Sequence, residues 1–229
     1  MREPFSVVYE DNHVLVVVKA PNILSQADAT GDTDLLSLLK GYIGIKYQKP
    51  GAVYLGLLHR LDRPVGGLMV FARTSKAAGR LSEQLRTHAV SREYLLVVQG
   101  ELHEPFTLTD YLLKDEEKNR VAIVPEGTQA AKKAVLNGLP LGIKDGKTLL
   151  SVGLETGRAH QIRVQMAGLG HPLWGDARYG HGKPGEQIAL WGYRLSFTHP
   201  VTQKPHAYFS RPEGAAFISF SEEIDAQAF

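Results

Sequence analysis

Short apolar runs of strand length recur along the chain and outnumber the segments with helical spacing. Residues 14–18 are apolar at every position, which is typical of a strand buried on both faces. A polar turn at 10–13 separates this run from a shorter one at 5–9, so the two predict a hairpin. Strands are expected at 5–9, 14–19, 68–72, 94–98, 121–124, 148–154, 188–197 and 215–221.

Helical spacing of apolar residues occurs in three segments. Thr33 or Asp34 precedes the first and Thr74 or Ser75 precedes the second, as expected for residues that cap helix N-termini. Gly170 follows the third and is typical of a helix end. The helices are expected at 35–43, 75–87 and 162–169.

The connections between these elements indicate the fold class. Hairpin-like connections outnumber strand–helix–strand alternations, which favours an α+β fold with a mainly antiparallel sheet. Residues 130–136 are ambiguous, because their alanines and lysines favour a helix whereas 133–136 also fit a strand. No repeat or long linker interrupts the 229 residues, so a single domain over 1–229 is expected.

The composition excludes several kinds of chemistry. The chain contains no cysteine, which rules out disulfides, thiolate nucleophiles, cysteine-ligated zinc and iron–sulfur clusters. Its nine histidines are scattered without metal-ligand spacing, so we assign no metal site. No stretch has the length and apolar character of a signal peptide or a membrane span, so a cytoplasmic protein is expected.

The formal net charge of +2 conceals an uneven distribution. Residues 59–98 contain seven basic and three acidic residues, whereas 213–229 contain four acidic residues and no lysine or arginine. Positive charge in the middle of a nearly neutral chain is compatible with local binding of a polyanion. It is equally compatible with a solvated basic face.

Two segments concentrate groups that could carry chemistry. In the first, Asp62 lies between Arg60 and Arg63 in a loop rich in glycine and proline. Neighbouring cations favour the ionised carboxylate, which keeps it available as a nucleophile or a base. Gly66 and Gly67 would allow a substrate or another backbone to approach closely. The alternative is a structural Asp–Arg ion pair beside a Gly-Gly turn.

The second segment, residues 155–163, is a strand-to-helix turn that carries two arginines. A helix N-terminus offers free N–H groups and the positive end of its dipole to a phosphate. Arg158 and Arg163 are about one and a half turns apart, so one could face a phosphate while the other faces the interior. A capped helix with surface arginines is the alternative.

Together these motifs resemble those of the RluA-type RNA pseudouridine synthase family. Three motifs occur in the same order with matching intervals, and the similarity runs from about residue 5 to about residue 220. The residues that carry it are His59-Arg60-Leu61-Asp62, Arg92-Glu93-Tyr94 and Thr156-Gly157-Arg158-Ala159-His160-Gln161-Ile162-Arg163, continued by Gly170-His171-Pro172, Gly175-Asp176 and Tyr179-Gly180.

The resemblance implies a pseudouridine synthase fold, with a mainly antiparallel central sheet flanked by helices and loops, in which 130–136 is a strand. It implies isomerisation of uridine to pseudouridine in ribosomal or transfer RNA, without a metal or an organic cofactor. Asp62 matches the family's essential aspartate, Tyr94 the aromatic residue that packs on the base, and Arg163 the arginine that pairs with the aspartate. Residues implied to contact RNA or the target nucleotide are His59, Arg60, Leu61, Arg158, His160 and Leu190.

The implied reaction explains these residue types. The target base must leave its stack at a cost of about a few kcal/mol, which an arginine such as Arg60 and an aromatic platform can offset. A buried carboxylate needs a cationic partner such as Arg163 to stay ionised. Whether Asp62 attacks the sugar, attacks the base or removes a sugar proton stays open.

The chain departs from the family pattern at two places. Val65-Gly66-Gly67 replaces a triplet that often carries hydroxyl groups, and Trp191 stands where a smaller or polar residue is common. Because the match begins near residue 5, we do not expect the RNA-binding module that precedes the catalytic domain in many relatives. The acidic tail shows no sign of a coiled coil or a swapped helix, so a monomer is expected. The competing hypotheses are a catalytically silent RNA-binding or RNA-remodelling protein on the same scaffold, and a carboxylate-dependent glycosidase, which would need a second acid.

Overall fold

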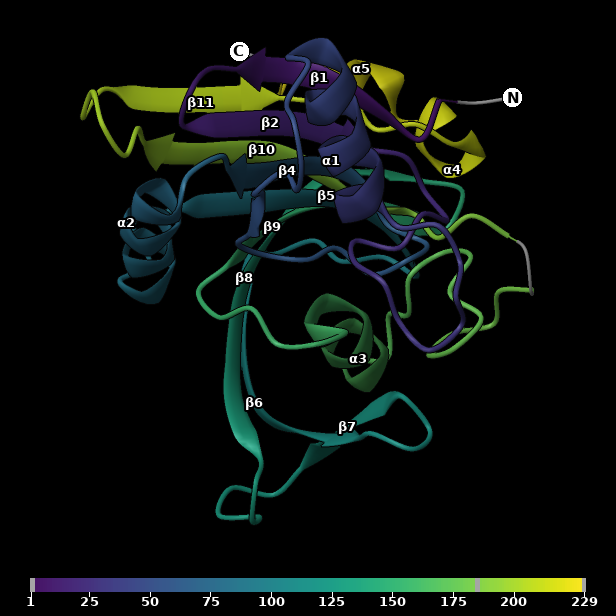
Figure 1. Ribbon diagram of the computed structural model, residues 1–229. Coiled ribbons are helices and arrows are strands. Elements are labelled where there is room, and N and C mark those ends of the chain that lie inside the picture. The colour runs from purple at the N-terminus through teal and green to yellow at the C-terminus, as the bar shows by residue number, and fades with distance from the viewer. Residues whose placement is uncertain (1–2, 184–185, 228–229) are drawn as a thin grey trace. The chain divides into compact units, whose positions relative to one another are not determined.

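The computed structural model describes residues 3–183 and 186–227 (Figure 1). Residue contacts divide the chain into two compact units, which are described separately here. The first unit comprises residues 1–91 and 192–210, and the second comprises 92–191 and 211–229. The chain passes between them inside β5 (Ser91–Gln99), inside β10 (Leu190–Thr198) and again between Ser210 and Arg211. The single domain expected over 1–229 stays a prediction.

The first unit is a small sheet with two helices. Its strands follow the order β1, β2, β4, β10, with β11 beside β10 and the short β3 beside β4. The pairs β1–β2, β2–β4, β3–β4 and β10–β11 are antiparallel. The elements are β1 (Phe5–Glu10), β2 (Val14–Lys19), α1 (Leu35–Lys46), β3 (Gly56–Leu57), β4 (Gly66–Ala72), α2 (Ser75–Arg86) and β11 (Pro205–Phe209).

Local sequence places α1, α2 and β2 as predicted. The Asp34 carboxylate accepts a hydrogen bond from the Ser37 N–H at 3.0 Å and caps α1, and the Thr74 hydroxyl does the same for α2 with the Ala77 N–H at 3.1 Å. Residues 14–17 of β2 have no solvent-exposed surface, which confirms a strand covered on both faces. Leu81 of α2 packs in the cluster that covers one of these faces.

The backbone of another strand lies directly against Gly67 of the Gly-Gly turn. Its φ is +127°, and a Cβ atom there would lie 2.4 Å from the backbone N and O of Gly192. The close neighbour is therefore another backbone, within the first unit, at the point where the Asp62 loop enters β4.

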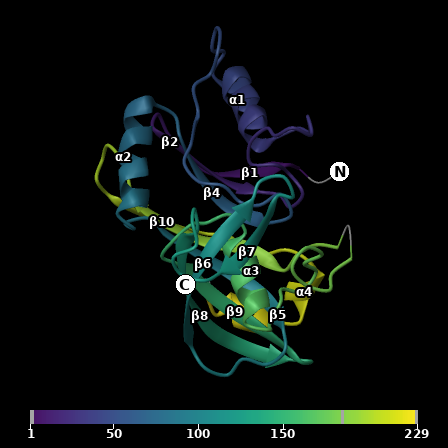
Figure 2. The ribbon, with the colours of Figure 1, turned by 90° about the horizontal axis from the view of Figure 1, so that it is seen from below.

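The second unit is an antiparallel sheet in the order β5, β9, β8, β6, β7. The remaining strands are β6 (Phe106–Asp115), β7 (Arg120–Val124), β8 (Lys132–Lys144) and β9 (Lys147–Leu154). β8 confirms that the ambiguous segment 130–136 is mainly strand. Helix α3 (Gln161–Gly168) lies against β7 (Figures 1 and 2). The two elements are so close at Gly168 that a Cβ atom there would lie 2.5 Å from Ile123 Cδ1.

The strand expected at 215–221 is wrong. Two short helices occupy this region, α4 (Ala215–Ile218) and α5 (Ser221–Asp225). Phe217, Phe220 and Ile224 are buried and are separated by three and four residues, which is the spacing of one helix face. The buried apolar residues of this run therefore have helical spacing, although the composition of the run is typical of a strand.

Three strands were not predicted: the two-residue β3, β6 and β11. Most residues of β6 are half-buried or exposed, and threonines and charged residues alternate with its apolar positions. The predicted α+β class with a mainly antiparallel sheet is nevertheless confirmed by the strand pairs named above. In the described ranges, no helix combines the length and apolar character that a membrane crossing requires.

Candidate active site

The loop that carries Asp62 is held on both sides of this residue. The Ser25 hydroxyl donates to the Leu61 carbonyl at 2.6 Å and accepts from the Leu61 N–H at 3.1 Å. The Arg63 carbonyl accepts from the Asn22 N–H at 2.8 Å, and the Val65 N–H donates to the Asp62 carbonyl at 3.0 Å. The backbone of the loop is thereby held by segments far away in the sequence, while the Asp62 side chain remains half-buried.

The neighbours of Asp62 differ in exposure. His59 is buried, and its Nε2 accepts a hydrogen bond from the Val70 N–H at 3.1 Å, so it helps to shape the start of the loop. Leu61 is also buried, whereas Arg60 is exposed to solvent. Arg63 forms an exposed ion pair with Asp32 at 2.6 Å. Arg60 therefore has the exposure that contact with RNA requires, and RNA contacts by His59 and Leu61 stay predictions.

A buried lysine lies beneath the same loop. The Lys19 ammonium has no exposed surface and donates to the carbonyls of Ala20 at 3.0 Å, Ile23 at 2.7 Å and Arg63 at 3.1 Å. Burial lowers the pKa of Lys19 to about 7, while the charge of Asp62 opposes this shift. We did not single out Lys19 from the sequence, where its only signal is a lysine at the end of an apolar run.

We expect Lys19 to make stability depend on pH above neutrality. The unfolded chain keeps a lysine pKa of about 10.4, so between about pH 7 and pH 10 the folded state binds fewer protons. Stability then rises with pH by up to about 1.4 kcal/mol per pH unit through this group. In urea denaturation, the deficit of Lys19→Met relative to wild type should therefore be larger at about pH 9 than at about pH 7.

Lys40→Met is the control for this prediction, because Lys40 is an exposed lysine on α1. The effect of Lys40→Met should be the same at both pH values. A Lys19→Met deficit that does not change with pH would contradict the titration of Lys19 in this range.

In the second unit, Tyr94 lies on β5 opposite Val152 of β9, and only 6% of its surface is exposed. The adjacent Glu93 points to the other face of the strand, since successive side chains alternate. Leu190, at the start of β10, is 5% exposed, and the neighbouring Trp191 is completely buried. Trp191 is thus a core residue here.

Residues 155–163 form a tightly connected turn into α3. The Gln161 side-chain oxygen accepts from the Arg158 N–H at 3.0 Å and from the Thr156 hydroxyl at 2.8 Å. Arg158 is exposed, whereas Arg163 is 6% exposed. This confirms the expectation that one arginine faces outward and the other inward. His160, the N-cap of α3, is a non-glycine residue in the left-handed region, with φ 50° and ψ 20°.

Arg163 forms a bidentate ion pair with Asp176. Its Nε and Nη2 each donate to one carboxylate oxygen at 2.8 Å, and both side chains are almost fully buried. Burial alone would raise the pKa of Asp176, but the hydrogen bonds and charge of Arg163 outweigh it and hold this pKa below its usual value. The sequence pointed to Gly175-Asp176 as a motif and assigned it no role. The expected pairing of Arg163 with Asp62 stays a prediction.

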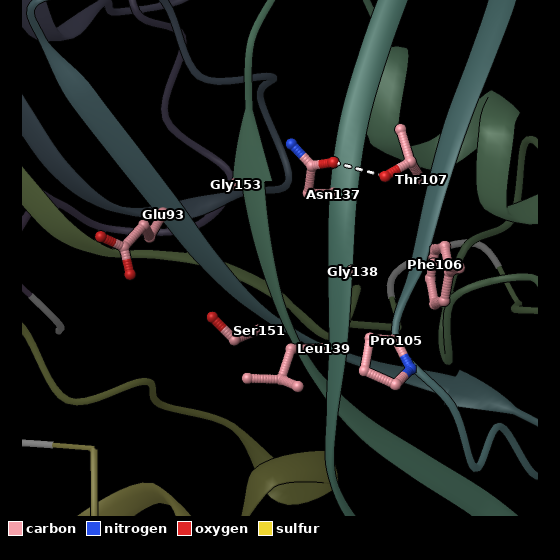
Figure 3. Close-up of a pocket in the computed structure, with 9 residues that line it drawn as sticks. All are labelled: Glu93, Pro105, Phe106, Thr107, Asn137, Gly138, Leu139, Ser151 and Gly153. Carbon is pink, nitrogen blue, oxygen red and sulfur yellow. Dashed lines mark hydrogen bonds between the residues drawn. The ribbon is translucent and has the colours of Figure 1, made fainter.

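A cavity in the second unit is lined by residues other than these side chains. It has a volume of about 480 Å³, and its lining includes Glu93, Asn137 and Ser151 (Figure 3). The Glu93 side chain points to the face of β5 opposite to that of Tyr94, since successive side chains of a strand alternate. The Phe106 ring covers Gly138 there, and the Thr107 hydroxyl donates to Asn137 Oδ1 at 2.6 Å. It contains none of the predicted site residues. Within the described part of the chain, no group of three or more His, Asp or Glu side chains is placed to hold a metal ion.

The comparisons with known proteins agree with the class of fold described above. The family described as RNA pseudouridylate synthase matches residues 13–168. Ribosomal large subunit pseudouridine synthase D of Zymomonas mobilis is 31% identical over 96% of this chain and 69% of its own length. The uncharacterized RNA pseudouridine synthase YjbO of Bacillus subtilis is 35% identical over 88% of this chain and 70% of its own length.

This chain belongs to the RNA pseudouridylate synthase family. The RluA-type resemblance and the predicted class of enzyme are thereby confirmed. The relatives are longer, and the chain spans 65% of YhcT, another uncharacterized RNA pseudouridine synthase of Bacillus subtilis.

Solved structures confirm the fold. Human RNA Pseudouridylate Synthase Domain Containing 4 has a TM-score of 0.75 at 18% identity, over 96% of this chain and 92% of that chain. Human RNA Pseudouridylate Synthase Domain Containing 1 has a TM-score of 0.66 at 24% identity, over 91% and 83% of the two chains.

Proposed function

We propose that this chain isomerises specific uridines to pseudouridine in structured RNA, with Asp62 as the catalytic carboxylate. The observation that carries the proposal is the Asp62 loop. In a member of this family, backbone hydrogen bonds fix the residues on both sides of Asp62, whose side chain is half-buried. Positioning of this kind is what a nucleophile or a base requires.

The proposed reaction moves one bond and needs no external reagent. The bond from the sugar C1′ to uracil N1 breaks, the base turns, and a bond from C1′ to C5 forms; C5 then loses its proton and N1 gains one. Tyr94 offers an aromatic ring on which the base can stack. Arg163 would keep Asp62 ionised, Arg60 would help to displace the nucleotide, and Arg158 is exposed as a phosphate contact requires.

Ribosomal RNA is the favoured substrate class within this proposal. Several relatives at 31–36% identity are described as ribosomal large subunit pseudouridine synthases. Transfer RNA remains the second class. A cytoplasmic location belongs to the same proposal, since these RNAs are cytoplasmic molecules. The monomeric state stays a prediction.

Tritium release tests the proposal directly. RNA labelled with tritium at uracil C5 loses the label only when C5 is deprotonated, so the purified protein should release tritium from bulk RNA. Separate ribosomal and transfer RNA fractions identify the substrate class. Pseudouridine mapping in cells with and without the gene then locates the uridine. RNA binding without tritium release from either fraction would favour the catalytically silent alternative.

A further inference from the structure

Tyr179 contacts two of the predicted site residues of the second unit. Its ring lies against Arg163, with the guanidinium carbon 5.3 Å from the ring centroid. The N–H groups of Arg178 and Tyr179 donate to Asp176 Oδ1 at 2.9 and 3.1 Å, and this carboxylate holds Arg163. One short turn, 176–179, therefore fixes Arg163 through a carboxylate and through an aromatic face.

The Tyr179 hydroxyl forms hydrogen bonds with Val121 and His160. It accepts from the Val121 N–H of β7 at 2.8 Å and lies 2.8 Å from His160 Nδ1. Because Val121 is the donor in the first bond, the single hydroxyl proton is available for Nδ1 of a neutral His160. When the hydroxyl donates to Nδ1 in this way, the imidazole proton is on Nε2, and His160 has a donor on that nitrogen.

The surroundings keep this arrangement rigid. Val121 belongs to a buried cluster with Val164 of α3, and Tyr179 packs against it. His160 holds a left-handed backbone conformation that costs a non-glycine residue about 1–2 kcal/mol. A strained residue whose side chain is also fixed is more typical of a functional position than of an ordinary helix start.

We propose that Tyr179 is a positioning residue of the candidate active site, which orients Arg163 and sets His160 as a hydrogen-bond donor through Nε2. An N–H donor suits the acceptors that RNA presents, which are phosphate oxygens and the uracil carbonyls. The inference rests on the proposed function for its effect on rate. The state of His160 can be measured without any activity.

The first test is the tautomer of His160. In ¹⁵N NMR spectra of the neutral imidazole, the wild-type protein should show the Nε2–H form. Tyr179→Phe removes one oxygen and keeps the ring, so the Nδ1–H form should appear alongside. Tyr111→Phe is the control, because Tyr111 lies on β6 and its hydroxyl bonds to the exposed Glu126. An unchanged His160 spectrum in Tyr179→Phe overturns the inference.

The second test asks whether Tyr179 acts through His160. Tyr179→Phe should lower kcat/KM about tenfold, as expected for one lost hydrogen bond. In a His160→Ala background the same change should lower it less than about twofold, since the partner is absent. A full tenfold loss in that background would indicate a general structural effect and overturn the inference. If wild type releases no tritium, the proposed function fails, and the NMR result still decides the role of Tyr179.

Discussion

Asp62→Asn should abolish tritium release from C5-labelled RNA, with a loss of at least about 10³-fold in single-turnover rate. Removal of a nucleophile or an essential base has effects of this scale or larger. Asparagine has nearly the same shape and can neither attack an electrophile nor accept a proton at neutral pH. The contacts that shape the loop use the backbone of Leu61, Asp62 and Arg63, so we expect the variant to fold and to bind RNA.

Asp32→Asn is the matched control. Asp32 is an exposed carboxylate of the same unit, and it pairs with Arg63, next to Asp62. Loss of an exposed ion pair costs up to about 1 kcal/mol, so this variant should keep its rate within about fivefold. Normal product formation by Asp62→Asn would move the catalytic carboxylate elsewhere. An equal loss in both variants would indicate a damaged loop and not a missing catalytic group.

Much of the fold could be predicted because the information was local. The continuous apolar run at 14–18 and the caps at Asp34 and Thr74 are properties of neighbouring residues, and these elements were placed correctly. β6 was missed because its alternation of threonine, apolar and charged residues gives little signal. The prediction of a strand at 215–221 was wrong because a short apolar run fits both the strand period and the helical period. Only the residues that pack against it in the fold decide between the two.

The features of the candidate site that could be predicted are likewise the local ones. Sequence motifs pointed to the loop around Asp62 and the turn before α3, which are local features. The buried Lys19 ammonium and the pairing of Arg163 with Asp176 depend on which distant segments meet in the fold. Spacing alone could not identify these partners, because a charged side chain gives no sign in the sequence of the group that will neutralise it.

The Arg163–Asp176 pair should have the largest effect on stability. Arg163→Met leaves the Asp176 carboxylate buried without its cation, and removal of one partner from a buried pair costs about 3–5 kcal/mol. In urea denaturation near neutral pH, the variant should therefore lose several kcal/mol of its free energy of unfolding. Arg211→Met is the matched control, because Arg211 makes the same two-point contact with Asp225 and both side chains are more than half exposed. Its loss should stay below about 1 kcal/mol.

The dependence on pH separates a missing ion pair from a simple packing defect. In the wild type the pKa of Asp176 lies below its usual value, so its stabilising contribution is present above about pH 4 and is lost as the pH falls through the folded-state value. In Arg163→Met the unpaired buried carboxylate should bind a proton more readily in the folded state. The deficit relative to wild type should thus shrink between about pH 7 and about pH 4.

A double variant extends the test if Arg163→Met is too unstable to purify. Arg163→Met with Asp176→Asn removes both charges, so it should be more stable than Arg163→Met alone and should show little change in its deficit between about pH 7 and about pH 4. It should remain inactive in tritium release, because Arg163 is required in the proposed site whatever the stability of the chain. Recovery of activity in the double variant would show that Arg163 serves the fold alone, and a pH-independent deficit in Arg163→Met would contradict the ion pair as the source of its stability.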